Sequence, residues 1–257
     1  MNVLHEDAAL LGPNDPDPVE WVNADSRAPV LLLCEHAGQA VPESLGGLGL
    51  PPGALDGHIG WDIGAEALAR AIAARLSAPL VLQRYSRLVI DCNRPPDTPQ
   101  SVPAVSDGVA VPLNAGASGV EREARRREVF EPLDLAIADG FARHPRHAAF
   151  SVHSFTRTMN GSDRIWHAGF LSRADTATAS ALMSHVCAAD DSVALDLNQP
   201  YEIEDDGDWF IPVHAEPRGL RHTLIEVRND QLDDEAGVAR WADLLSDAIA
   251  TMLEPEP

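Results

Sequence analysis

The chain has 257 residues, enough for one large domain or two small ones with a full hydrophobic core. It carries 19 basic and 40 acidic residues, a formal net charge of −21, and every basic residue is arginine. Such a charge repels phosphate backbones and argues against nucleic acid as a partner. Because there is no lysine, a Schiff-base mechanism and a phosphate-binding P-loop are excluded.

No apolar run approaches the ~18 residues that a membrane-spanning helix needs, so we expect no membrane association. Residues 1–21 carry acidic side chains where a secretory signal peptide carries basic ones. The cysteines, Cys34, Cys92 and Cys187, are too few and too scattered for a disulfide framework. These features predict a cytoplasmic protein with reduced thiols, and none of them specifies an oligomeric state.

Predicted strands and helices alternate along the first half of the chain. Residues 1–27 form a polar, proline-rich extension, and the apolar run 29–34 then predicts a buried strand. Dense proline and glycine at 42–57 predict a surface loop. Apolar residues recur at helical spacing from 64 to 76, and Asp62 stands where a helix N-cap is expected.

Two short apolar runs, 80–82 and 88–90, predict further strands, the second of which is stopped by a pair of prolines. Residues 120–144 predict a helix interrupted at Pro132, and its charged first half is typical of a solvated helix face.

The same alternation continues in the second half of the chain. It contains predicted strands at 148–152, 165–171 and 222–228, helices at 175–189 and 235–253, and an irregular acidic stretch at 196–221. Alternating strands and helices predict a single α/β domain over residues 1–257, with three αβα layers around a mainly parallel, mixed sheet.

Polar residues terminate several of the predicted strands. In open α/β sheets, ligands bind beyond the carboxyl ends of the strands. The residues found there are His36, the pair Asn93 and Arg94, the pair His153 and Ser154, and the region of Glu226 and Arg228. A single strand-end histidine is more often a loop residue that bonds to a carbonyl group. The coincidence of several such ends favours a functional site.

Two imidazoles and a carboxylate are the donors that a hydrolytic zinc site requires, since three protein ligands leave one position for a water molecule. His36 and His153 are the candidate nitrogen donors. Asp62, at a loop-helix junction, is a better carboxylate than Glu35, whose side chain should point away from that of its neighbour His36. We therefore predict one divalent metal ion, with Zn²⁺ as the first candidate.

Glu226 lies within the apolar run 224–227, where a carboxylate is expected to be buried and to need a partner or a role. One interpretation is an ion pair with an arginine such as Arg87 or Arg94. The other is a general base that takes a proton from the attacking water and returns it to the leaving amine.

Five segments, taken together and in this order, resemble the N-formylglutamate amidohydrolase family, whose fold is related to the zinc-dependent exopeptidases. They cover residues 30–231 and are 34–38 (CEHAG), 58–62 (HIGWD), 86–95 (SRLVIDCNRP), 153–156 (HSFT) and 224–230 (LIEVRND). The resemblance implies a zinc-exopeptidase-like fold and an enzyme that hydrolyses a linear amide, by default N-formyl-L-glutamate to formate and glutamate.

The resemblance also implies roles for individual residues. His153 corresponds to a zinc ligand, Glu226 to the catalytic base, and Asn93 with Arg94 to the group that binds a substrate carboxylate. Arg87 and Ser154 complete the expected substrate-binding residues.

Two departures from the family pattern leave parts of this assignment open. The exopeptidase relatives place a glutamate three residues after the first histidine, but this chain has Gln39, which is why Asp62 receives the carboxylate role and Glu35 stays the alternative. The family's Ser-Pro-His is replaced by Cys34, Glu35 and His36, which indicates a divergent subgroup and leaves the acyl group and amino acid open.

Three alternatives accompany this interpretation. The substrate could be another N-acyl amino acid or a small peptide, or the chain could be a non-catalytic module that binds a carboxylate through Arg94. A serine or cysteine hydrolase using Ser154 or Cys34 is disfavoured, because neighbouring residues on a strand point to opposite faces and no G-x-S-x-G motif is present.

Overall fold

The computed structural model describes residues 9–159, 161–204 and 207–254. Its main feature is a seven-stranded sheet with the strand order β1-β3-β2-β6-β11-β9-β10. In that order the strands are Val19–Val22, Leu80–Gln83, Val30–Cys34, Ala148–Phe155, Arg221–Arg228, Ala168–Leu171 and Leu195–Leu197. Strands β3, β2, β6 and β11 are parallel, and antiparallel pairing joins β1 to β3 and β9 to β11. The sheet is therefore mixed with a parallel centre, as predicted.

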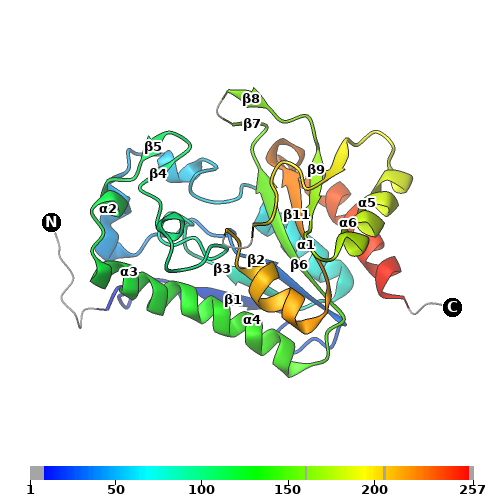
Figure 1. Cartoon of the computed structure of the whole chain (residues 1–257), viewed down its shortest axis with the longest axis horizontal. Helices are drawn as coiled ribbons and strands as arrows, with labels where there is room; N and C mark the ends of the chain where they lie inside the picture. Colours follow the sequence, from blue (N-terminus) through cyan, green and yellow to red (C-terminus); the bar gives the residue numbers. More distant parts are fainter. Residues whose placement is uncertain (1–8, 160, 205–206, 255–257) are drawn as a thin grey trace.

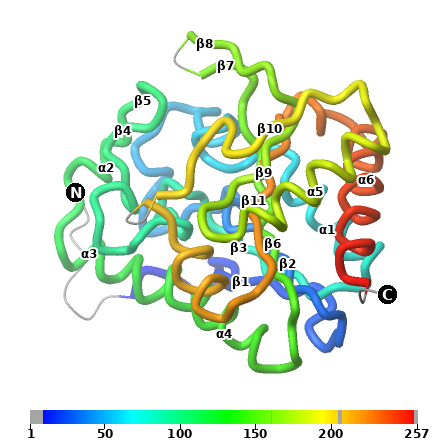
Figure 2. The backbone as a smooth tube through the Cα atoms, turned by 45° about the vertical axis from the view of Figure 1, so that its right-hand side comes forward, coloured from blue at the N-terminus to red at the C-terminus, as the bar shows by residue number. Residues whose placement is uncertain are grey.

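Helices cover both faces of the sheet (Figures 1 and 2). On one face lie α1 (Ala65–Leu76), α5 (Thr176–Ala189) and α6 (Glu235–Leu253), and on the other lies α4 (Glu131–Arg143). Side chains alternate along the strands, so that Leu32 joins the first core while Leu31 and Leu33 join the second. This confirms the three-layer αβα architecture. Of the described helices, none is long and apolar enough to cross a membrane.

The remaining elements are short. They are η1 (Glu43–Gly49), η2 (Ala54–Asp56), η3 (Pro99–Ser101), β4 (Val105–Ser106), β5 (Val109–Ala110), α2 (Pro112–Ala115), α3 (Gly119–Arg125), η4 (Arg126–Phe130), β7 (Thr158–Met159), β8 (Ser162–Asp163), η5 (Phe210–Ala215), η6 (Glu216–Arg218) and η7 (Asn229–Gln231).

The structure corrects two predictions made from the sequence. Residues 88–90 form no strand; they turn, with the Val89 N–H donating to the Ser86 carbonyl at 2.9 Å, and their side chains are buried. A three-residue apolar run fits a buried turn as well as a strand, so the pattern could not separate the two. The polar extension 1–27, whose first eight residues lie outside the described part, contributes the edge strand β1.

Candidate metal centre and active site

The sheet brings His36 and His153 together although they are far apart in the chain. Strands β2 and β6 are parallel neighbours, with Leu33 opposite Ser151. His36 follows the end of β2, and His153 lies inside β6, which continues beyond its predicted end at residue 152. The two imidazole rings meet edge to face, with centroids 4.8 Å apart.

Backbone contacts fix the loop that carries His36. The Asp62 N–H donates to the His36 carbonyl oxygen at 3.0 Å, which holds the loop before α1 against the end of β2. Two residues after His36, the backbone passes so close to the Arg84 carbonyl that a Cβ atom at Gly38 would lie 2.0 Å from its oxygen. Only glycine fits at this position of the CEHAG segment.

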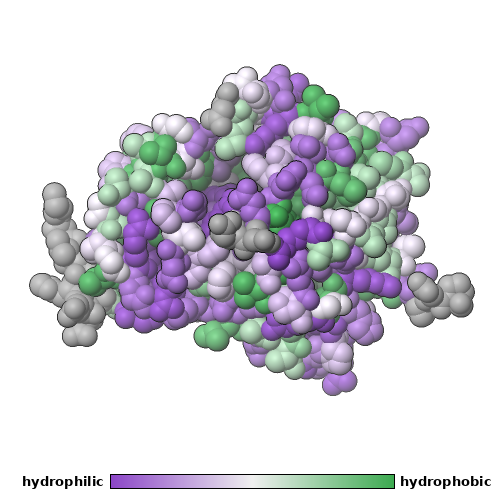
Figure 3. Space-filling model, viewed as in Figure 1, coloured by the Kyte–Doolittle hydropathy of each residue, from purple (hydrophilic) through white to green (hydrophobic). Residues whose placement is uncertain are grey.

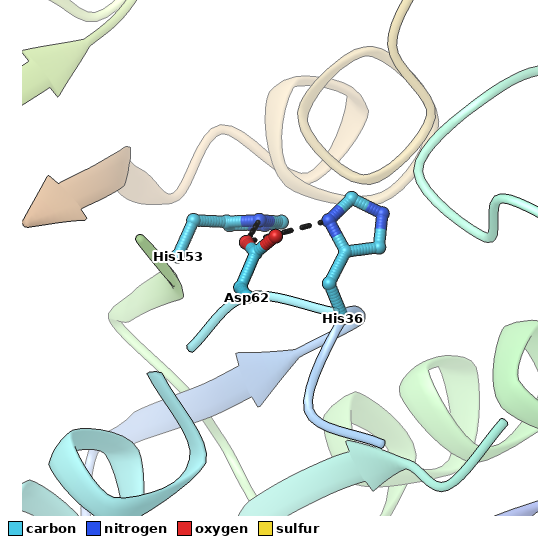
Figure 4. A group of neighbouring side chains, drawn as sticks. All are labelled: His36, Asp62 and His153. Atoms are coloured by element: carbon cyan, nitrogen blue, oxygen red, sulfur yellow. Dashed lines mark hydrogen bonds and ion pairs between the residues drawn. The ribbon is translucent and has the colours of Figure 1, made fainter. Parts of the chain in front are cut away.

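Asp62 lies between the two histidines (Figure 4). Its Oδ2 atom is 2.9 Å from His153 Nδ1 and 3.5 Å from His36 Nδ1. One possible ligand atom from each of the three residues lies within 4.8 Å of the others, and all three side chains are buried. Burial alone would raise the pKa of Asp62, but the two histidines hold it well below its ordinary value.

Each histidine has a second carboxylate on the opposite side of its ring. His36 Nε2 lies 2.7 Å from Asp91 Oδ1, and His153 Nε2 lies 3.3 Å from Glu35 Oε2, which also accepts a hydrogen bond from Ser151. Metal-bound histidines commonly donate their other ring N–H to a carboxylate, which fixes the tautomer. Protons on both Nε2 atoms would leave both Nδ1 lone pairs facing Asp62.

This arrangement fits a divalent cation. His36 Nδ1 is buried and has no hydrogen-bond partner among the described residues. The cluster contains the buried carboxylate of Asp62, and those of Glu35 and Asp91 contact its histidines. A cation would offset this negative charge. Because Asp62 meets the Nδ1 side of both rings while Glu35 meets only Nε2 of His153, the geometry favours Asp62 over Glu35 as the carboxylate ligand.

Arg87 is held by the carboxylates of this cluster. Its Nη2 lies 2.7 Å from Asp91 Oδ2, and its Nη1 lies 3.3 Å from Asp62 Oδ1. Within the described residues, no arginine lies at ion-pair distance from Glu226, so the ion-pair interpretation of that residue has no support in this arrangement.

Glu226 lies opposite His153 in the pairing of β11 with β6. Its side chain is 6% exposed, and Oε2 has no hydrogen-bond partner in the described structure. Burial raises the pKa of this carboxyl to about 7, although nearby cationic groups oppose the rise. A carboxyl with a pKa near neutrality, beside the His-Asp-His cluster and lining the cavity, is suited to proton transfer.

The three other predicted residues have defined partners. Asn93 Oδ1 accepts hydrogen bonds from the N–H groups of Trp209 and Phe210 at 3.2 and 3.1 Å. Ser154 Oγ donates to the Ile63 carbonyl oxygen at 2.7 Å. Arg94 donates to the Gly207 carbonyl oxygen. Asn93 and Ser154 thus already bind backbone groups, and their contact with substrate stays a prediction.

All eight predicted site residues line one cavity of about 470 Å³. Figure 3 shows that hydrophilic residues predominate around the centre of the molecular face drawn there. A further group of polar cavity residues was not predicted from the sequence; it comprises Asp107, Tyr201, Glu202, Glu204 and Asp208. His58, which also lines the cavity, lies in the 58–62 segment that carries the family resemblance. The residues that were not predicted lie mostly in irregular segments, where no periodicity marks a functional position. For the four of them within 196–221, the acidic composition of that stretch was the one signal.

The fold and the cavity define an α/β enzyme with a buried His-Asp-His cluster. Residues 28–232 match the family described as N-formylglutamate amidohydrolase, and the chain belongs to this family. Membership of this family makes it an enzyme of the amidohydrolase class.

Two solved structures are similar to the chain. Gene product Atu2144 from Agrobacterium tumefaciens has 34% sequence identity and a TM-score of 0.89, over 95% of this chain and 100% of its own. The N-formylglutamate amidohydrolase from Ralstonia eutropha JMP134 shares the fold, with 17% identity and a TM-score of 0.63, over 92% of this chain and 97% of its own. No functionally curated protein matches the chain.

Proposed function

We propose that this amidohydrolase uses one divalent metal ion, with Zn²⁺ as first candidate, to hydrolyse the amide bond of a small N-acyl amino acid. The observation that carries the proposal is the cluster of His36, Asp62 and His153 at the inner end of the cavity, with Glu226 beside it. The family name makes N-formyl-L-glutamate the first substrate to test.

The cluster supplies donors of the kind that catalytic zinc uses, with a carboxylate behind each histidine. A metal ion held by His36, Asp62 and His153 would supply Lewis-acid chemistry, which would polarise the amide carbonyl and make water a better nucleophile. Glu226 accepts the proton of the attacking water and passes it to the departing nitrogen. Glu226 has no ion-pair partner among the residues that the structure describes and its pKa is raised, and both features support this role.

Arg94 binds the α-carboxylate of the substrate. Its guanidinium group lines the cavity and, among the described residues, has no carboxylate at ion-pair distance. A guanidinium group presents a planar fork that meets a carboxylate with two parallel hydrogen bonds, which fixes the orientation of the substrate.

The test combines metal analysis with turnover. We expect about one equivalent of metal per chain, and hydrolysis of N-formyl-L-glutamate or of another member of a panel of N-acyl amino acids. A chelator should abolish turnover and re-addition of metal should restore it. Retention of full activity in metal-free protein would contradict the metal-dependent mechanism.

Matched variants assign the loss to the cluster. The His36→Ala variant should lose stoichiometric metal and turnover while it remains folded. His147→Ala removes an exposed histidine outside the cavity and should change neither. If His36→Ala keeps both metal and activity, the ion does not bind at this cluster.

A further inference from the structure

The cavity holds more carboxylates than its chemistry requires. Besides the cluster and Glu226, its walls carry Asp107, Glu202, Glu204 and Asp208. Asp107 pairs with His58 at 2.9 Å. Asp208 is half-buried, accepts hydrogen bonds from Asn93 Nδ2 and the Glu204 N–H, and burial raises its pKa.

The arginines that line the cavity offer fewer positive charges. Arg87 is held by Asp62 and Asp91, so its charge is already balanced within the site. Arg94 is the one lining arginine of the described residues without a carboxylate at ion-pair distance, and it donates a hydrogen bond to the Gly207 carbonyl oxygen. Among the described residues that line the cavity, Arg94 can therefore neutralise one substrate carboxylate.

A second substrate carboxylate would meet an acidic surface. The side chains of Glu202 and Glu204 are exposed and have no hydrogen-bond or ion-pair partner among the described residues. Like charges brought together without a counter-ion disfavour binding and so set specificity. Apolar wall residues offer contact for an aliphatic side chain; they include Phe155, Met159 and Leu171.

From this charge balance we propose that the enzyme selects N-acyl amino acids with a single carboxylate, whose side chain is neutral or cationic, over dicarboxylates such as N-formyl-L-glutamate. The inference rests on the proposed function and specifies the substrate class of the same site. Arg94 binds the α-carboxylate, and Glu202, Glu204 and Asp208 face the side chain of the substrate.

The sharpest test compares N-formyl-L-glutamine with N-formyl-L-glutamate, which have the same length and shape and differ in charge. In the metal-loaded wild-type enzyme, we expect kcat/KM to be about 10- to 100-fold higher for the glutamine compound at low ionic strength. The ratio should fall as salt is added, because salt screens the charges of Glu202 and Glu204, the exposed carboxylates at the mouth of the cavity. N-formyl-L-lysine should be accepted as well.

Two double variants locate the source of the preference. Glu202→Gln with Glu204→Gln should reduce the glutamine-to-glutamate ratio by at least about threefold, mainly by improving the glutamate compound. The control, Asp191→Asn with Asp247→Asn, makes the same change in net charge at exposed positions outside the cavity and should leave the ratio unchanged. An equal fall of the ratio in both double variants would overturn the inference.

Calorimetric binding of the same two compounds separates failure of this inference from failure of the proposed function. If N-formyl-L-glutamate is hydrolysed as well as N-formyl-L-glutamine, or bound more tightly, the inference is wrong while the proposed function stands. If neither is hydrolysed by the metal-loaded enzyme but the glutamine compound binds more tightly, the proposed function fails and the selectivity stands.

Discussion

The inner end and the mouth of the cavity are built in different ways. At the inner end, each donor side chain is buried and held by a second group, as His36 is by Asp91 and His153 by Glu35. At the mouth, Glu202 and Glu204 are exposed and their carboxylates have no partner among the described residues. The inner end is thus held by contacts within the protein, whereas the mouth acts mainly through its charge.

The largest effect should come from removing a donor at the inner end. His153→Ala deletes a side chain that meets both Asp62 and Glu35. We expect loss of stoichiometric metal and of turnover, with a circular dichroism spectrum like that of the wild type. Mass spectrometry of the purified variant measures the metal, and its full retention would remove His153 from the ligand set.

Glu226→Gln should spare the metal and slow the chemistry. The amide keeps the shape of the side chain but cannot accept the proton, so kcat should fall by about 10²- to 10⁴-fold. Steady-state kinetics, with metal content measured on the same sample, distinguish this from loss of the ion. Normal turnover would place the base elsewhere, with Glu35 as the next candidate.

Arg94→Lys tests how the cavity binds the α-carboxylate of the substrate. Lysine keeps the charge but loses the planar fork, so transition-state stabilisation should fall by about 2–4 kcal/mol for substrates with a free α-carboxylate. An amide-capped substrate should be poor for the wild type and should respond little to the substitution. Equal wild-type rates on capped and free substrates would show that Arg94 does not bind the carboxylate.

Glu35→Gln should weaken metal binding at the inner end without abolishing it. The carboxylate behind His153 fixes the ring and raises its basicity, and loss of such a group typically costs about 10- to 100-fold in metal affinity. Competition with a chelator of known affinity measures the change. Ser151→Ala, which removes the hydroxyl that donates to Glu35, should cost less, and the opposite order would assign Glu35 a different role.

The smallest effect concerns the stability of the metal-free protein. Burial raises the pKa of Glu226 to about 7 from 4.5, so its contribution to stability is fully present below pH 4.5 and is lost as pH rises through 7. Glu226→Gln does not titrate. Relative to wild type, its free energy of unfolding in urea should rise between about pH 4.5 and 7 and then level off. A difference that does not change with pH would contradict this.

The sequence predicted the position of cavity residues where a regular element carries them. The run 29–34 forms the buried strand that precedes His36, and the run around Glu226 forms strand β11. The rule that ligands bind beyond the carboxyl ends of strands therefore predicted that His36 and Glu226 lie at the cavity. Asp62 followed from its position before α1. These side chains are set by local patterns and by the order of parallel strands.

The same reasoning could not supply contacts that depend on tertiary packing. Asp91 follows the buried turn at residues 88–90, where the sequence predicts a strand. Its contact with His36 depends on the path of that turn. The partners of Glu35 lie on β6, far along the chain. Glu202 and Glu204, the carboxylates at the mouth, lie in a segment without hydrophobic periodicity. The sequence pattern therefore does not predict to which side their side chains point.

The parallel pairing of β2 with β6 also has a consequence for how the enzyme matures. His36 and His153 come together only when the two strands have paired. Strands that are distant in the sequence pair late in folding, because closing the long loop between them costs conformational entropy. A nascent or partly refolded chain therefore offers one histidine at a time. In refolding experiments with a metal-sensitive dye, we expect tight metal uptake to lag behind helix formation and to coincide with completion of the sheet.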